Sequence, residues 1–208
     1  MARAGQQDLV VLVPGRDDQA ALAGILARHE ALGIRQVRAT FQRHPDRDPG
    51  CLLRGHEFLR PQANRFRHAL VMFDRAGCGR EGRGREELEA EVESRLSTSG
   101  WGDRAAVVVI NPELEIWVWA DSPHVDIELG WQGRDPDLRS WLAQEGFLQA
   151  DEHKPQRPKE AVEKALRLAG KRRSSAIYRQ LAGRVSLQRC EDPAFLKLRD
   201  TLRGWFHV

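Results

Sequence analysis

The apolar run Leu9-Val-Val-Leu-Val13 is followed at once by the turn pair Pro14-Gly15 and then by two N-cap candidates, Asp17 and Asp18. An uninterrupted apolar run of this kind is typical of a strand that is buried on both faces, as strands of parallel sheets are. Apolar residues then recur at helical spacing, at Ala21, Leu22, Ile25 and Leu26. The stretch therefore predicts a buried strand that leads directly into a helix.

Three more strands are predicted downstream, at residues 36–41, 68–73 and 105–110, and helical patterns separate them. Buried strands that alternate with helices are typical of parallel sheets, in which each connection crosses over with a right-handed sense. The sequence therefore predicts an α/β, Rossmann-like fold with a mainly parallel four-stranded sheet and flanking helices.

The strand pattern stops near residue 120. Asn111-Pro112 predicts a helix directly after the fourth strand, because the first turn of a helix does not need the N–H that proline lacks. Further helices are predicted over residues 138–144, 158–169, 175–181 and 193–206. We therefore divide the chain into an α/β domain, residues 1–147, and a helical C-terminal extension, residues 148–208, that packs on it.

The composition is that of a globular protein: of 208 residues, 41% are hydrophobic and 30% charged. No apolar run approaches the roughly 18 residues of a membrane span, and the N-terminus lacks the apolar stretch of a secretion signal. The cysteines, Cys51, Cys78 and Cys190, are odd in number and form no CxxC pair. We expect a cytoplasmic protein with no membrane contact.

Charge is segregated along the chain, with a net −12 over residues 86–153 and a net +9 over residues 154–208. The two blocks either neutralise each other within the fold or present an acidic and a basic face to partners. The basic candidates for binding nucleic acid or a partner protein are Lys154, Arg157, Lys159, Lys171, Arg172, Arg173 and Arg179. Basic clusters beside serines at a helix start suit phosphate binding, and a solvated or acid-paired helical surface is the alternative.

Carboxylates follow several predicted strands. Asp17 and Asp18 come after the first strand, and Asp74, Glu113 and Glu115 come after the third and fourth strands. The carboxyl ends of parallel strands meet at one edge of a sheet, and carboxylate oxygens suit Mg²⁺ or Mn²⁺. We name Asp74, Glu113 and Glu115 as candidate metal ligands and Mg²⁺ as the candidate cofactor. The alternative is that Asp74 begins a turn while the two glutamates occupy a first helical turn.

Four longer stretches resemble a component of bacterial methylation-associated defence systems, multi-gene anti-phage clusters that include a DNA methyltransferase. They are His68-Ala-Leu-Val-Met-Phe-Asp-Arg-Ala-Gly-Cys-Gly79, Val107-Val-Val-Ile-Asn-Pro-Glu-Leu-Glu-Ile-Trp-Val-Trp-Ala-Asp-Ser-Pro-His-Val125, Arg157-Pro-Lys-Glu-Ala161 and Arg173-Ser-Ser-Ala-Ile-Tyr-Arg-Gln-Leu181. The resemblance spans about residues 8–206. It implies that the other proteins of such a system are partners of this chain.

A more distant resemblance is to TOPRIM-related defence proteins, which hold Mg²⁺ with a strand-one glutamate and a strand-three Asp-x-Asp. Asp74 matches the first aspartate, Glu115 fits a later Pro-x-x-Glu-x-Trp signature, and Gly15 matches the glycine after the glutamate. The glutamate itself falls on Pro14, and the second aspartate falls on Ala76. The pattern implies a TOPRIM-like domain in which two expected carboxylates are missing.

Two classes of function follow. In the preferred one, the chain is a non-catalytic or catalytically degenerate component of a defence system that recognises nucleic acid or partner proteins. The alternative is a Mg²⁺-dependent nuclease or phosphoryl-transfer enzyme that uses Asp74 with Glu113 or Glu115. DNA and a second copy of the chain are further candidate partners.

Overall fold

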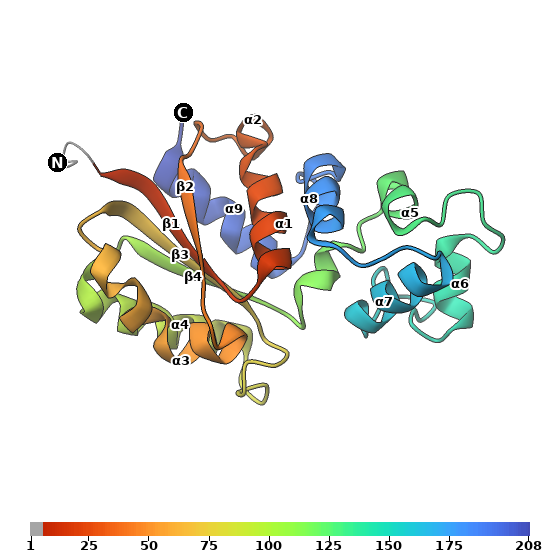
Figure 1. The fold of residues 1–208 in the computed structure, drawn as a ribbon, viewed down its shortest axis with the longest axis horizontal. Helices are drawn as coiled ribbons and strands as arrows, with labels where there is room; N and C mark the ends of the chain where they lie inside the picture. The colour runs from red at the N-terminus through yellow and green to blue at the C-terminus, as the bar shows by residue number, and fades with distance from the viewer. Residues whose placement is uncertain (1–5) are drawn as a thin grey trace.

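The computed structural model describes residues 6–208, which contain a four-stranded sheet with parallel pairings and the strand order β2-β1-β3-β4 (Figure 1). The strands are β1 (Gln7–Val13), β2 (Ala39–Arg43), β3 (Phe66–Asp74) and β4 (Ala105–Ile110). This sheet confirms the predicted Rossmann-like α/β fold. The second strand begins at Ala39 rather than at residue 36, because the Asp8 carboxylate holds the preceding connection through the Arg35 guanidinium and the Arg38 N–H.

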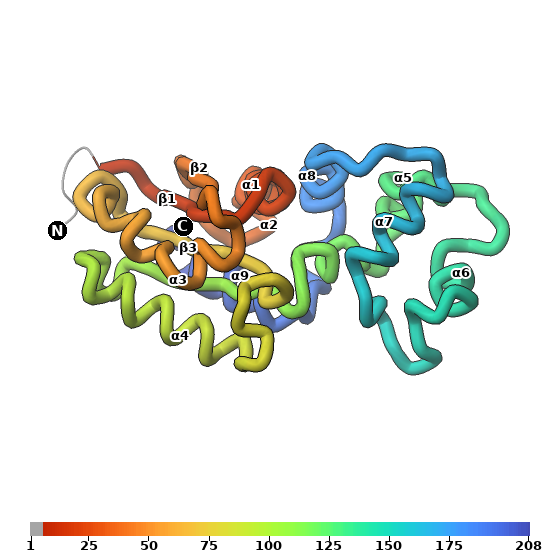
Figure 2. The backbone as a smooth tube through the Cα atoms, turned by 60° about the horizontal axis from the view of Figure 1, so that its bottom comes forward, coloured from red at the N-terminus to blue at the C-terminus, as the bar shows by residue number. Residues whose placement is uncertain are grey.

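Helices cover both faces of the sheet (Figures 1 and 2). One face carries α1 (Arg16–Leu26), α2 (His29–Leu32) and α9 (Pro193–Phe206), and the other carries α3 (Arg47–Leu59) and α4 (Arg85–Leu96). Short turns η1 (Arg60–Gln62) and η2 (Ser97–Trp101) follow α3 and α4. The chain leaves β1 toward β2 and leaves β3 toward β4, so the carboxyl ends of β1 and β3 flank the point where the strand order reverses. Open α/β sheets bind their ligands at this point.

Successive side chains of each strand point to opposite faces of the sheet, so the hydrophobic core has one part on each face. In β1, Val11 and Val13 pack on the side of α1 and α9, whereas Val10 and Leu12 pack on the side of α3 and α4. All four are fully buried. Burial on both faces explains why the strand reads as one uninterrupted apolar run rather than as an alternating pattern.

Beyond the sheet the chain forms a helical lobe, which we define as residues 118–174. It contains α5 (Pro123–Leu129), α6 (Leu138–Gln144) and α7 (Pro158–Leu168), and a cluster of tilted aromatic rings, Trp131, Trp141 and Phe147, lies within it. The chain then returns through α8 (Ser175–Arg184), which packs along α1, and ends in α9 against the sheet (Figure 1). Within residues 6–208, no helix is long and apolar enough to cross a membrane.

The prediction that Asn111-Pro112 begins a helix was wrong. The Asn111–Pro112 peptide bond is cis, and the segment is tied to the loop after β3. The Ala76 N–H donates to the Pro112 carbonyl, and the Arg75 guanidinium donates to the Asn111 side chain. These tertiary hydrogen bonds outweigh the local helix signal, so that only a short 3-10 turn, η3 (Leu114–Trp117), follows.

The outer edge of β4 is closed by carboxylates. The outward N–H groups of Val107 and Val109 donate to Glu93 and Glu89 of α4, each over 2.9 Å. The Lys197 ammonium of α9 lies between these two carboxylates, at 3.1 Å from Glu89 and 2.7 Å from Glu93. Because a free strand edge is a template for unwanted pairing, this arrangement protects that side of the sheet.

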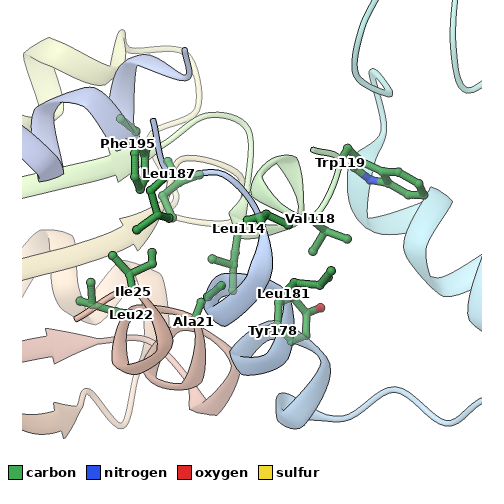
Figure 3. Close-up of a cluster of buried hydrophobic side chains, with 14 of the residues drawn as sticks. Ala21, Leu22, Ile25, Leu114, Val118, Trp119, Tyr178, Leu181, Leu187 and Phe195 are labelled. Atoms are coloured by element: carbon green, nitrogen blue, oxygen red, sulfur yellow. The ribbon is translucent and has the colours of Figure 1, made fainter. Parts of the chain in front are cut away.

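The close approach of α1 to α8, whose side chains share one buried apolar cluster (Figure 3), makes Gly24 sensitive to substitution. A Cβ at Gly24 would lie 2.8 Å from both the Ala182 Cβ and the Arg179 carbonyl oxygen, whereas a Cβ at Gly204 of α9 would meet no atom within 4 Å. We expect Gly24→Ala to lower the free energy of unfolding by about 1–2 kcal/mol, because the overlap outweighs the better helix propensity of alanine. Gly204→Ala is the matched control and should raise it by about 0.5–1 kcal/mol. Urea unfolding measures both, and equal effects of the two variants would contradict the tight α1–α8 contact.

Candidate acidic site at the carboxyl edge of the sheet

Three aspartates meet where β1, β2 and β3 end. Asp18 is the third residue of α1, Asp48 is the second residue of α3, and Asp74 is the last residue of β3. The Asp74 N–H donates to Asp48 Oδ1 over 2.9 Å, and the charges of Asp18 and Asp48 both act on Asp74. We call this group the acidic centre. It lies at the point where the strand order reverses.

Asp18 is buried and Asp48 and Asp74 are half-buried, and the negative charges of the acidic centre have few partners. Asp18 is 7% exposed, and among the described residues neither its Oδ1 nor the buried Oδ1 of Asp74 has a hydrogen-bond partner. Burial, followed by the charge of Asp48, raises the pKa of Asp18 to about 7. Burial, followed by the charges of Asp18 and Asp48, raises the pKa of Asp74 well above its usual range, and burial also raises that of Asp48. Burial therefore shifts all three carboxyl groups toward their protonated forms.

The two predicted glutamate ligands lie close enough to raise the pKa of Asp74, yet each is engaged elsewhere. Glu113 Oε1 accepts from the Lys159 N–H in the first turn of α7 over 3.1 Å. The Glu115 side chain is 3% exposed and lies 2.7 Å from both the Arg173 guanidinium and the Tyr178 hydroxyl. Both glutamates therefore join the sheet edge to the segments that follow it.

Arg173 is the centre of this junction. Its guanidinium pairs with Asp17 at 2.9 Å, with Glu115 at 2.7 Å and with Glu163 of α7 at 2.8 Å. The Ser175 hydroxyl adds a 2.6 Å hydrogen bond to Asp17. The Arg173 side chain thus neutralises the acids around the acidic centre, but it makes no ion pair with Asp18, Asp48 or Asp74 among the described residues.

The predicted basic residues fall into three groups. Lys171 and Arg173 are bound internally: the Lys171 ammonium donates to the carbonyls of Ile127 and Glu128 at the end of α5. Arg157 pairs with Glu160 on the surface and lies 4.9 Å from the Phe147 ring centre. Among the predicted basic residues, Lys154, Lys159, Arg172 and Arg179 form neither an ion pair nor a side-chain hydrogen bond within residues 6–208. Of these, Lys159 acts electrostatically on both Asp48 and Glu113, which places it beside the acidic centre.

Sequence reasoning placed Asp18 and Asp74 at this edge but missed Asp48. Asp48 lies in the stretch His44-Pro-Asp-Arg-Asp-Pro-Gly50, which has the composition of a loop. The available signal was its position directly after the second strand, since every parallel strand delivers its following residues to the same edge. In the part of the chain that the structure describes, no set of three or more His, Cys, Asp or Glu side chains is arranged to hold a metal ion.

Comparison with known proteins identifies no relative: no protein-family model, curated protein or solved structure matches the chain. The chemistry of the site is therefore argued from its residues.

Arg173 and Arg172 are adjacent in the sequence but differ in their contacts. We expect Arg173→Met to lower the free energy of unfolding by about 2–4 kcal/mol, because it leaves the buried Glu115 carboxylate without its counter-ion. Arg172→Met removes an exposed charge and should change stability by less than about 0.5 kcal/mol. Thermal and urea unfolding measure both. Equal stability of the two variants would show that the Arg173 contacts are not structural.

The pKa of Asp18 predicts a pH dependence of stability. The folded protein holds the Asp18 proton up to about pH 7, whereas the unfolded chain releases it near its ordinary value of 3.8. Stability therefore falls as the pH rises between these values and levels off above them. Asp18→Asn removes this loss, so its stability relative to the wild type should rise by about 2–3 kcal/mol between pH 5 and pH 8.

Asp17→Asn is the matched control for that experiment. Asp17 is paired with Arg173 and Ser175, so the loss of its charge should destabilise the protein at pH 8. Melting temperatures of both variants from pH 5 to pH 8 provide the comparison. If Asp18→Asn were as destabilising as Asp17→Asn at pH 8, the acidic centre would be a compensated structural cluster.

Proposed function

We propose that the acidic centre binds a divalent cation, Mg²⁺ or Mn²⁺, together with a phosphate group of its ligand. The observation that carries the proposal is the pair of buried carboxylate oxygens on Asp18 and Asp74 that have no partner within residues 6–208. Buried unpaired carboxylates destabilise a protein, and such violations are expected at functional sites.

The donor set fits this class of cation. Asp18, Asp48 and Asp74 offer only hard oxygen atoms, the ligands that Mg²⁺ takes. Mg²⁺ is commonly held by one or two carboxylates, with water and the phosphates of a ligand filling its other positions. A site of this kind does not need three converging protein ligands. Asp74 and Asp18 would hold the cation, while the Asp74 N–H orients Asp48 beside them.

The protonation of the centre couples binding to pH. Burial raises the pKa of Asp18 to about 7 and also raises that of Asp74, so a cation competes with protons for these carboxyl groups. A bound cation supplies the positive charge that the buried carboxylates lack and attracts a phosphate oxygen. Exposed Lys159, which lies beside Asp48, offers a second positive charge to the same phosphate.

The resemblance supports a biological setting for this site. The family pattern expects carboxylates where Pro14 and Ala76 stand, and Asp18 and Asp48 bring carboxylates to the same sheet edge from helices α1 and α3. We place the chain in the cytoplasm, in a multi-protein bacterial anti-phage defence system, with DNA and the other proteins of that system as partners.

The first candidate for this site is a Mg²⁺-dependent nuclease or phosphoryl-transfer enzyme. The second is a non-catalytic role, and the position of Glu115 favours it. Glu115 fits the family signature, but Arg173 and Tyr178 occupy its carboxylate in this structure. A cation at the acidic centre would then hold a nucleic acid without cleaving it. The two candidates share the binding site and differ in whether the bound phosphodiester is hydrolysed.

Mn²⁺ titration followed by electron paramagnetic resonance tests the proposal. We expect wild type to bind Mn²⁺ with an affinity that rises by up to about tenfold per pH unit below pH 7, since binding displaces a proton. Asp74→Asn should abolish binding. Asp103→Asn is the control. Asp103 is exposed and comes just before the start of β4, at the end of the strands away from the acidic centre, so this variant should leave Mn²⁺ binding unchanged.

Failure of the wild type to bind Mn²⁺ at pH 8, or equal binding by Asp74→Asn, would overturn the cation site. Incubation of wild type with plasmid and single-stranded DNA in Mg²⁺ or Mn²⁺ then separates the two candidates. Cleavage that is lost in Asp74→Asn indicates the enzyme, whereas Mn²⁺-dependent DNA binding without cleavage indicates the recognition role.

A further inference from the structure

The two edges of the sheet differ chemically. At β4, the outward N–H groups of Val107 and Val109 are taken by Glu93 and Glu89, and Lys197 holds these carboxylates in place. That edge has no free donor at these positions for another strand. The opposite edge is β2, which pairs with β1 on its inner side.

The hydrogen-bond pattern shows which residues of β2 face outward. The Leu9 N–H donates to the Arg38 carbonyl, and the His44 N–H donates to the Val13 carbonyl. Because parallel strands use alternate residues for each neighbour, the even-numbered residues of β2 bond to β1 and the odd-numbered ones face away. The outward groups therefore belong to Ala39, Phe41 and Arg43, and within residues 6–208 their N–H groups have no hydrogen-bond partner.

The surroundings of this edge are basic and partly apolar. Arg38 precedes β2 and Arg43 ends it; both are exposed and form no ion pair among the described residues. Phe58 of α3 is 36% exposed, and its ring lies 5.1 Å from that of His44, directly after the strand. An incoming strand would meet unpaired backbone donors, an arginine at each end and an aromatic ring beside the last residues.

We infer that β2 is a docking edge for an extended, acidic segment of a partner protein, which adds to the sheet as a fifth strand. Backbone hydrogen bonds supply the affinity in this mode of recognition, and side chains that match the flanking groups supply the specificity. Acidic side chains complement Arg38 and Arg43. A second copy of the chain fits less well, because an antiparallel β2–β2 pair would bring the basic ends of two copies together.

Synthetic peptides test this inference on the full-length protein. The probe is a fluorescently labelled peptide of alternating glutamate and valine, about six residues long, the usual length of a strand. The control peptide carries lysine in place of glutamate. We expect the protein to raise the fluorescence anisotropy of the acidic peptide but not that of the lysine peptide. The acidic peptide should also slow amide hydrogen exchange over residues 39–43 of the protein.

Two sets of variants separate backbone pairing from charge. Ala39→Pro removes one outward N–H while leaving the bonds to β1, since edge strands accept proline at outward positions. It should abolish peptide binding, whereas Ala39→Val, which keeps the N–H, should not. The double variant Arg38→Glu with Arg43→Glu should weaken binding by about tenfold or more. Melting temperatures confirm that each variant is folded.

Three results would overturn the inference. The first is no binding of the acidic peptide by wild type. The second is equal binding of the acidic and lysine peptides, or binding that Ala39→Pro does not change. The third is protection of residues 39–43 that appears without peptide and grows with protein concentration, which would identify a second copy as the occupant. None of these depends on the acidic centre, because the β2 edge and the cation site are tested by different ligands.

Discussion

The ion pair between Arg173 and Glu115 joins the sheet to the segments beyond it, at the edge where the acidic side chains gather. A carboxylate that is 3% exposed needs a partner in the folded state, because desolvation of an unpaired charge costs several kcal/mol. Arg173 comes from the connection between α7 and α8, so this partner is present only when the helical lobe is seated against the sheet. The same guanidinium also neutralises Asp17. Repulsion among the acids persists at the acidic centre, where no described cation forms an ion pair.

The rest of the fold supplies the stability that such a centre requires. Fully buried strands such as β1 pack apolar side chains on both faces, and each methylene removed from water contributes about 0.8 kcal/mol. The aspartates lie outside these apolar layers, at the ends of strands and in the first turns of helices. The negative charges at the carboxyl ends of the strands therefore do not disturb the packing of the apolar core. A protein with a large apolar sheet tolerates an unfavourable site at its rim, as is common where binding and stability compete.

The sequence predicts those features that depend on neighbouring residues. Uninterrupted apolar runs mark strands buried on both faces, and acids directly after such runs, at Asp18 and Asp74, are placed at the sheet edge by chain direction alone. Asp48 escaped prediction because its approach depends on how β2 pairs and how α3 begins. The opposing net charges of residues 86–153 and 154–208 do not reveal that Arg173 meets Glu115, 58 residues away. At Asn111 and Pro112 a local helix signal was overruled by hydrogen bonds from Arg75 and Ala76, which no local pattern encodes.

The closure of the β4 edge also sets an order of events during protein synthesis. Glu89 and Glu93 leave the ribosome before β4, but Lys197 follows Glu89 by 108 residues. At typical elongation rates this delay is on the order of ten seconds. During that time Glu89 can pair with Arg85 of its own helix, but Glu93, which accepts from the Val107 N–H, lacks its ammonium partner. The C-terminal helix is thus the segment that completes the protection of the β4 edge.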